Sequence, residues 1–208
     1  HPLIVHVASA QGVQRFASHV PDFAQKLIDA FWPGPLTLIL PRRPEVAAVA
    51  AGGQNSVGLR CPLHPVAHVV LQSAEALGVF GVAAPSANLF GRVSPTTAAH
   101  VASEFGDGLL IIDGGACDVG IESTIVDCTR AAPVLLRPGV LTPKQLSDAC
   151  GVTVVTPNVP DIDAPRASGT LESHYAPTAQ VQLMTAAELQ KAIDDGKYFT
   201  YPPVAGYQ

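Results

Sequence analysis

The amino-acid sequence predicts an α+β protein in which helices flank a mixed β-sheet. Short runs of β-branched and aliphatic residues alternate with segments of helical periodicity, and glycine and proline turns separate them. Between residues 109 and 137, three strand-like runs follow one another without a helix between them. This clustering favours mixed strand pairing over the strict alternation of strand and helix in a Rossmann fold.

The first part of the chain is expected to supply four strands, over residues 3–7, 36–40, 57–60 and 79–83. Apolar residues at helical spacing predict a helix over 22–31, which the turn sequence WPGP ends. A second helix is expected between the third and fourth strands. Its apolar face is expected to comprise Val66, Val69, Val70, Ser73 and Leu77.

A third helix is expected to begin at Ser94 and to end near Phe105, because a serine hydroxyl accepts a free N–H and Pro95 suits the first turn. Thr142 is expected to begin a short helix that Gly151 ends. The strands expected around these helices cover 109–113, 121–127 and 134–137.

The composition changes after residue 155. Four prolines and little apolar periodicity predict a linker over 156–177. A strand over 181–184 and a helix capped by Thr185 and Glu188 then begin a further unit.

Composition and charge exclude several classes of protein. The net charge is −5 and no run of Lys or Arg occurs, so a tight, general nucleic-acid binder is not expected. No apolar run approaches the roughly 20 residues that span a bilayer. The four cysteines form no C-x-x-C pair, and no Glu follows His64 as in a zinc protease. A reducing cytoplasm and no metal site are therefore expected.

The loop at 84–96 carries the densest group of polar side chains. It follows a predicted buried strand and precedes a predicted helix, where free N–H groups and the helix dipole favour an anion. Serine, asparagine and glycine are also ordinary turn residues, so a loop without a ligand is the alternative.

Four other groups lie at strand ends or in the linker. Arg60 and Arg137 each end a strand and can clamp a carboxylate or phosphate, although a surface salt bridge is the alternative for Arg60. Ser123 and the next residue place hydroxyls in an apolar strand, which indicates a polar cavity or cross-strand packing. His174 and Tyr175 can cover a nucleotide or attach the linker to the core.

Six motifs resemble, in order, those of the YrdC family of threonylcarbamoyl-AMP synthases. They are PLIVHV (2–7), FWPGPLT (31–37), VGLR (57–60), PSAN (85–88), ESTIVD (122–127) and LRPG (136–139). HYAP at 174–177 is similar to the linker of the longer, two-domain members. The resemblance implies a YrdC-like twisted mixed sheet with flanking helices in residues 1–155. It also implies the linker at 156–177 and an incomplete C-terminal Rossmann-like unit over 178–208.

The resemblance also implies an enzyme. L-Threonine, bicarbonate and ATP, with Mg²⁺ on the phosphates, would give threonylcarbamoyl-AMP and pyrophosphate. A tRNA-modifying threonylcarbamoyltransferase complex would then transfer the threonylcarbamoyl group to a tRNA adenosine. Positioning and charge neutralisation suffice for this chemistry, so no catalytic acid or base is expected.

Matching positions imply two sets of contacts. The threonine side comprises His6, Arg60, Ser86 and Ser123. The ATP side comprises His1, Ser56, Ala84, Ser94, Arg137, His174 and Tyr175. The family's Lys-x-Arg motif is expected just upstream of His1, so the chain is expected to be truncated there and to lack that positive charge.

Two other functions remain open on the sequence. A YrdC-type domain has a concave face, so an RNA-binding module without catalytic activity is one alternative, although the acidic net charge opposes it. A carbamoyl-transfer domain of the kind used in hydrogenase maturation is the other. That relative would carry zinc-finger cysteines and an acylphosphatase-like domain, and neither is visible in this sequence.

Overall fold

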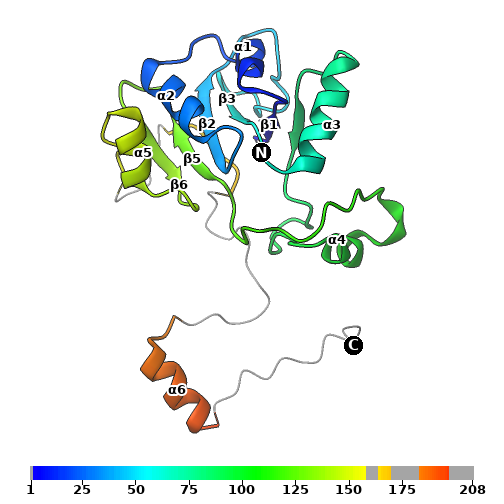
Figure 1. Cartoon of the computed structure of the whole chain (residues 1–208), viewed down its shortest axis with the longest axis vertical. Coiled ribbons are helices and arrows are strands. Elements are labelled where there is room, and N and C mark those ends of the chain that lie inside the picture. Colours follow the sequence, from blue (N-terminus) through cyan, green and yellow to red (C-terminus); the bar gives the residue numbers. More distant parts are fainter. Residues whose placement is uncertain (1, 158–163, 170–182, 197–208) are drawn as a thin grey trace.

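The computed structural model describes residues 2–157, 164–169 and 183–196. Its centre is a six-stranded sheet with the strand order β4-β1-β3-β2-β5-β6 (Figure 1). The strands are β1 Ile4–His6, β2 Leu36–Pro41, β3 Ser56–Arg60, β4 Val82–Ala84, β5 Thr124–Asp127 and β6 Val134–Arg137. β1–β3 and β2–β5 are parallel pairs and the other neighbours are antiparallel. The predicted mixed α+β sheet is thus confirmed.

Six α-helices lie in the described part of the chain. They are α1 Val13–Phe16, α2 Asp22–Phe31, α3 Pro65–Ala76, α4 Ala98–Phe105, α5 Pro143–Cys150 and α6 Ala186–Asp194. Two 3₁₀ turns, η1 Ala10–Gly12 and η2 Gly106–Gly108, precede α1 and follow α4. No described helix is both long enough and apolar enough to cross a membrane.

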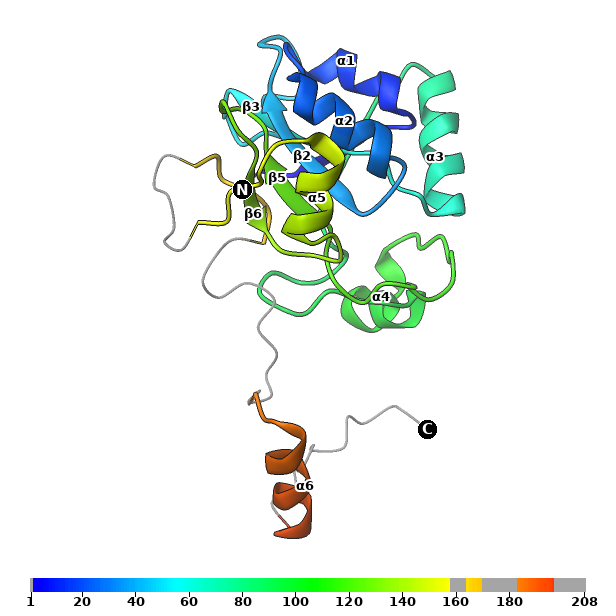
Figure 2. The ribbon, with the colours of Figure 1, turned by 60° about the vertical axis from the view of Figure 1, so that its left-hand side comes forward.

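One face of the sheet packs against α1, α2 and α5, and the main hydrophobic core lies between them (Figure 2). On β3, Val57 and Leu59 are buried in this core. Successive strand residues point to opposite faces, so Ser56, Gly58 and Arg60 face away from the helices. The helices contribute Val13, Ala24, Leu27, Ile28, Leu146 and Cys150 to the core.

Residues 164–169 lie on the opposite face of the sheet. Ala167 is 2% exposed and packs with Ile39 of β2. The Arg166 backbone N–H donates to Gln54 Oε1 at 2.8 Å, and Gln54 Nε2 donates to the Arg166 carbonyl at 3.1 Å. This part of the predicted linker therefore contacts the same face to which Gly58 and Arg60 belong.

Two predicted helix caps are confirmed. Thr142 forms a capping box with Gln145 at the start of α5, and Gly151 ends that helix with a φ of 74°. Thr185 forms a second capping box with Glu188 at the start of α6. Residues 181–182 of the strand predicted over 181–184 lie outside the described residues, and 183–184 are not in a strand.

The apolar face predicted for α3 is wrong. Leu71 is the buried residue of this helix, whereas Val69, Val70 and Leu77 are 60, 41 and 83% exposed. The cause is the position of α3 beside the edge strand β4, rather than across the sheet (Figure 1).

Two predicted elements around the 84–96 loop also differ. Ser94 does not cap a helix: α4 begins at Ala98, and Thr97 Oγ1 accepts the His100 N–H at 3.2 Å. Residues 109–113 are not a strand, and Leu110 is 90% exposed. An apolar run becomes a strand only where a neighbour supplies backbone partners, and the sheet of the described residues provides none at this position.

Candidate functional site

His6 and Arg60 are neighbours on the sheet face that the helices leave open. They are register partners in the parallel pair β1–β3. Arg60 Nε donates to the Gly34 carbonyl at 3.1 Å, which fixes the base of the guanidinium. Burial lowers the pKa of Arg60, whereas the nearby Glu122 carboxylate raises it. The result is a half-buried cation with hydrogen-bonding capacity left for an anionic ligand.

His6 is held in its neutral form. Burial first, and then the positive charge of Arg60, lower the pKa of His6 to about 4. Its Nδ1 atom is buried and has no hydrogen-bond partner in the structure. A buried polar atom without a partner costs free energy, so the position of His6 carries a cost in the folded protein.

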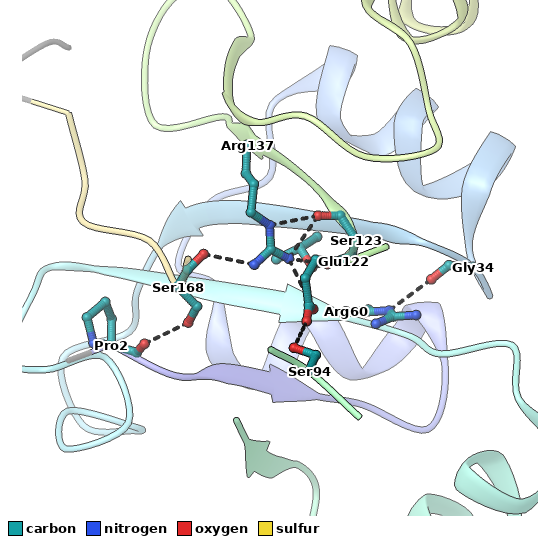
Figure 3. A network of polar contacts seen from close by, with 9 residues as sticks. Pro2, Gly34, Arg60, Ser94, Glu122, Ser123, Arg137 and Ser168 are labelled. Carbon is teal, nitrogen blue, oxygen red and sulfur yellow. Dashed lines mark hydrogen bonds and ion pairs between the residues drawn. The ribbon is translucent and has the colours of Figure 1, made fainter. Parts of the chain in front are cut away.

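Arg137 is anchored by the backbone at the start of β5. Its Nε and Nη2 atoms both donate to the Ser123 carbonyl, at 3.0 and 2.9 Å, and Nη2 also reaches the Ser123 hydroxyl at 3.0 Å. Nη1 donates to the Ser168 carbonyl at 2.9 Å, and the Ser168 hydroxyl donates to the Pro2 carbonyl at 2.8 Å. Arg137 therefore joins β6, β5 and the segment at 164–169 (Figure 3).

Glu122 lies at the centre of this network (Figure 3). Ser94 Oγ donates to Glu122 Oε1 at 2.5 Å, and Arg137 Nη2 lies 3.8 Å from Glu122 Oε2. The carboxylate thus connects the loop before α4 with the end of β6. It also places a negative charge between Arg137 and Arg60, whose charges otherwise repel each other.

The structure brings five predicted positions into this region, namely His6, Arg60, Ser94, Ser123 and Arg137. Ser56 lines a small pocket under Ala167 and Ser168, together with Ile4 and Gly58.

Ala84 pairs with Ile4 in the antiparallel pair β1–β4. Ser86 follows in the loop after β4 and is half-buried. The predicted positions His1, His174 and Tyr175 lie outside the described residues.

Sequence reasoning missed two members of the site. Thr37 is fully buried in β2 and its hydroxyl lies 2.8 Å from that of Ser123. Glu122 begins the ESTIVD motif but was not expected to be a site residue. The available signals were a hydroxyl within the apolar run LTLIL and a carboxylate directly before an apolar strand.

Comparison with known proteins identifies the family of this chain. A family model that covers the Sua5, YciO and YrdC proteins, described as "Telomere recombination", matches residues 1–139. The chain belongs to this family. The model of the threonylcarbamoyl-AMP synthase C-terminal domain matches residues 141–201.

Among curated relatives, the threonylcarbamoyl-AMP synthase of Pyrococcus abyssi is 42% identical over 184 residues, which cover 87% of this chain and 53% of the relative. That of Bacillus subtilis is 39% identical over 187 residues, or 88% of this chain and 53% of the relative. The chain therefore spans about half the length of these relatives.

Among solved structures, the crystal structure of P. abyssi Sua5 complexed with L-threonine matches with a TM-score of 0.83 at 37% identity. The match covers 94% of this chain and 58% of that one. The YrdC-like fold expected from the sequence motifs is confirmed.

Proposed function

We propose that this chain provides the catalytic domain of an L-threonylcarbamoyladenylate synthase. The protein would convert L-threonine, bicarbonate and ATP into threonylcarbamoyl-AMP, pyrophosphate and water. The observation that carries the proposal is the convergence of Arg60, Ser123, Arg137 and neutral His6 on the open sheet face of a family member. The relatives named as threonylcarbamoyl-AMP synthases support the same reaction.

In the proposed complex, Arg60 binds the carboxylate of threonine and His6 contacts the amino acid. Ser86 and Ser123 complete the threonine side. Neutral His6 suits this role because it adds no positive charge that would repel the threonine ammonium group before the carbamate forms.

ATP is proposed to lie along Ser56, Ala84, Ser94 and Arg137, with His1, His174 and Tyr175 as further contacts. The carbamate forms on the threonine nitrogen, and its oxygen then attacks the α-phosphorus. The bond to the bridging oxygen breaks and pyrophosphate leaves. Arg137 opposes the negative charge that gathers at this phosphorus, and binding both substrates side by side supplies the orientation.

Mg²⁺ is proposed to enter with the nucleotide. Among the described residues, no group of three or more His, Cys, Asp or Glu side chains could hold a metal ion. Bound Mg²⁺ would neutralise charge on the phosphates.

The proposed domain boundaries follow the packing. Residues 1–155 form the catalytic domain, because Leu146 and Cys150 of α5 lie in the main core and Val155 still bridges to Val134. Residues 156–177 are the linker, and 178–208 begin the C-terminal domain.

The proposed cellular setting is the cytoplasm, where a separate threonylcarbamoyltransferase complex would deliver the product to tRNA. All four cysteines are free, which agrees with a reducing compartment.

Pyrophosphate release by the full-length protein tests this function. Release should require threonine, bicarbonate and ATP together, and isothermal titration should detect binding of threonine and ATP. The same titrations on the 208-residue chain would show whether it suffices for binding. Salt-sensitive tRNA binding without threonine-dependent pyrophosphate release would instead favour the RNA-binding module.

A further inference from the structure

The carboxylate of Glu122 divides its two oxygens between two elements of the proposed nucleotide site. Oε1 accepts a hydrogen bond from Ser94, which precedes α4, and Oε2 faces Arg137 at the end of β6. Ser94 and Glu122 are 28 residues apart in the sequence. A hydrogen bond to a carboxylate is stronger than one between neutral groups, so this contact is a substantial link between the two elements.

The two ends of this link lie in different surroundings. Glu122 precedes β5, where a Cβ on Gly139 would lie 2.5 Å from the backbone N of Thr124 and 2.8 Å from the Glu122 carbonyl. The turn after β6 therefore packs directly against the backbone that carries Glu122. Ser94 lies in a loop whose neighbouring residues Leu89 and Phe90 are 42 and 79% exposed. Glu122 thus connects the Ser94 loop to the backbone that packs against the turn after β6.

Charge balance agrees with this arrangement. The Glu122 carboxylate raises the pKa of Arg60, and Arg137 lowers it. Arg137 itself lies 3.8 Å from Glu122, so this carboxylate offsets the repulsion between the two cations. Charge balance alone does not require the hydrogen bond to Ser94. The hydrogen bond indicates a second role, which depends on the acceptor oxygen rather than on the charge.

We propose that Glu122 is a positioning residue of the nucleotide site, which holds Ser94 and the loop before α4 beside Arg137. This inference rests on the proposed synthase function. Glu122 acts through Ser94 and not on the reacting atoms.

Glu122→Ala and Glu122→Gln separate the acceptor oxygen from the charge. Alanine removes both, so the KM for ATP of the full-length protein should be about tenfold higher in this variant than in Glu122→Gln, as expected for one lost hydrogen bond. Glutamine retains an acceptor for Ser94 and should keep the KM for ATP within about threefold of the wild-type value. The affinity for threonine should not fall in either variant, because removing a negative charge near Arg60 favours a bound carboxylate.

A double-mutant cycle with Ser94→Ala measures the link directly. If Glu122 acts through Ser94, Glu122→Ala should raise the KM for ATP much less in the Ser94→Ala background than in the wild type. Asp148→Ala is the matched control, since it removes a surface carboxylate that pairs with Lys144 at 2.7 Å on α5. Circular dichroism melting of each variant verifies folding.

The outcomes distinguish this inference from the proposed function. A wild-type protein without threonine-dependent pyrophosphate release would overturn the function itself. An active wild type with equal KM values for ATP in the Ala and Gln variants would overturn the positioning role. Full additivity with Ser94→Ala, or an equal loss of threonine affinity, would also overturn it.

Discussion

The hydroxyl groups of Thr37 and Ser123 lie 2.8 Å apart, and both side chains are buried. Thr37 belongs to β2 and Ser123 directly precedes β5, its parallel neighbour. Ser123 also bonds to Arg137 through its hydroxyl and its carbonyl. The Thr37 hydroxyl thus supports, from the centre of the sheet, the residue that anchors Arg137.

Replacing Thr37 by valine should reduce the free energy of unfolding by about 1–2 kcal/mol, because it removes a buried hydrogen bond and nearly preserves the shape. Urea denaturation monitored by circular dichroism measures this loss. Thr37→Ser keeps the hydroxyl and should retain the Ser123 contact. A valine variant as stable as the wild type would mean that the bond contributes no net stability.

Much of the fold follows from local chemistry in the sequence. The helix over 22–31 has the predicted bounds. Thr142 caps the start of α5 and Gly151 ends it, as their capping preferences indicate. The local sequence of 109–113 could not show that this segment would not form a strand. Strand formation depends on a neighbouring strand that comes from elsewhere in the chain. The exposure of Val69, Val70 and Leu77 on α3 likewise depends on which part of the chain packs against that helix.

The candidate site was predictable to a similar extent. Arg60 and Arg137 lie at strand ends, as their positions in the motifs indicated. The bond between Ser94 and Glu122 could not be predicted, because it depends on how the loop before α4 returns to β5. Local preference favoured Ser94 as a helix cap, but its hydroxyl instead bonds to Glu122, and Thr97 caps α4.

Arg60→Ala should lower the affinity for threonine by roughly a hundredfold, because the carboxylate loses a charged, bidentate partner worth about 3 kcal/mol. Isothermal titration of the full-length protein with threonine measures the change. The fold should persist, since the Arg60 side chain is not part of the main core.

Arg92→Ala is the matched control for Arg60, because its side chain is 60% exposed and pairs with Glu104 on the surface. Its affinity for threonine should equal that of the wild type. Unchanged affinity in the Arg60→Ala variant would remove Arg60 from the threonine site.

His6 should make the stability of the protein depend on pH. The pKa of His6 is about 4 in the folded protein and near 6.5 in the unfolded chain, so between these values the unfolded state binds more protons. The contribution of His6 is complete above about pH 6.5 and is lost as the pH falls towards 4. It amounts to about 3 kcal/mol at most, since each pKa unit corresponds to about 1.4 kcal/mol.

Urea denaturation at several pH values between 4 and 7 tests the His6 prediction. His6→Gln removes the titrating group, so the difference in unfolding free energy between wild type and variant should change with pH over this window. A constant difference would show that the pKa of His6 is not lowered in the folded state.

Ala167→Asp should release residues 164–169 from the sheet. Ala167 is 2% exposed and packs against Ile39, so a carboxylate at this position would be buried without a partner. Local opening should become easier by more than about 1.4 kcal/mol, and the backbone N–H of Arg166, which bonds to Gln54, should exchange with deuterium at least about tenfold faster. Ala116→Asp places the same charge at an exposed position and should leave this exchange rate unchanged. Equal rates in the two variants would mean that Ala167 does not fasten the segment to the sheet.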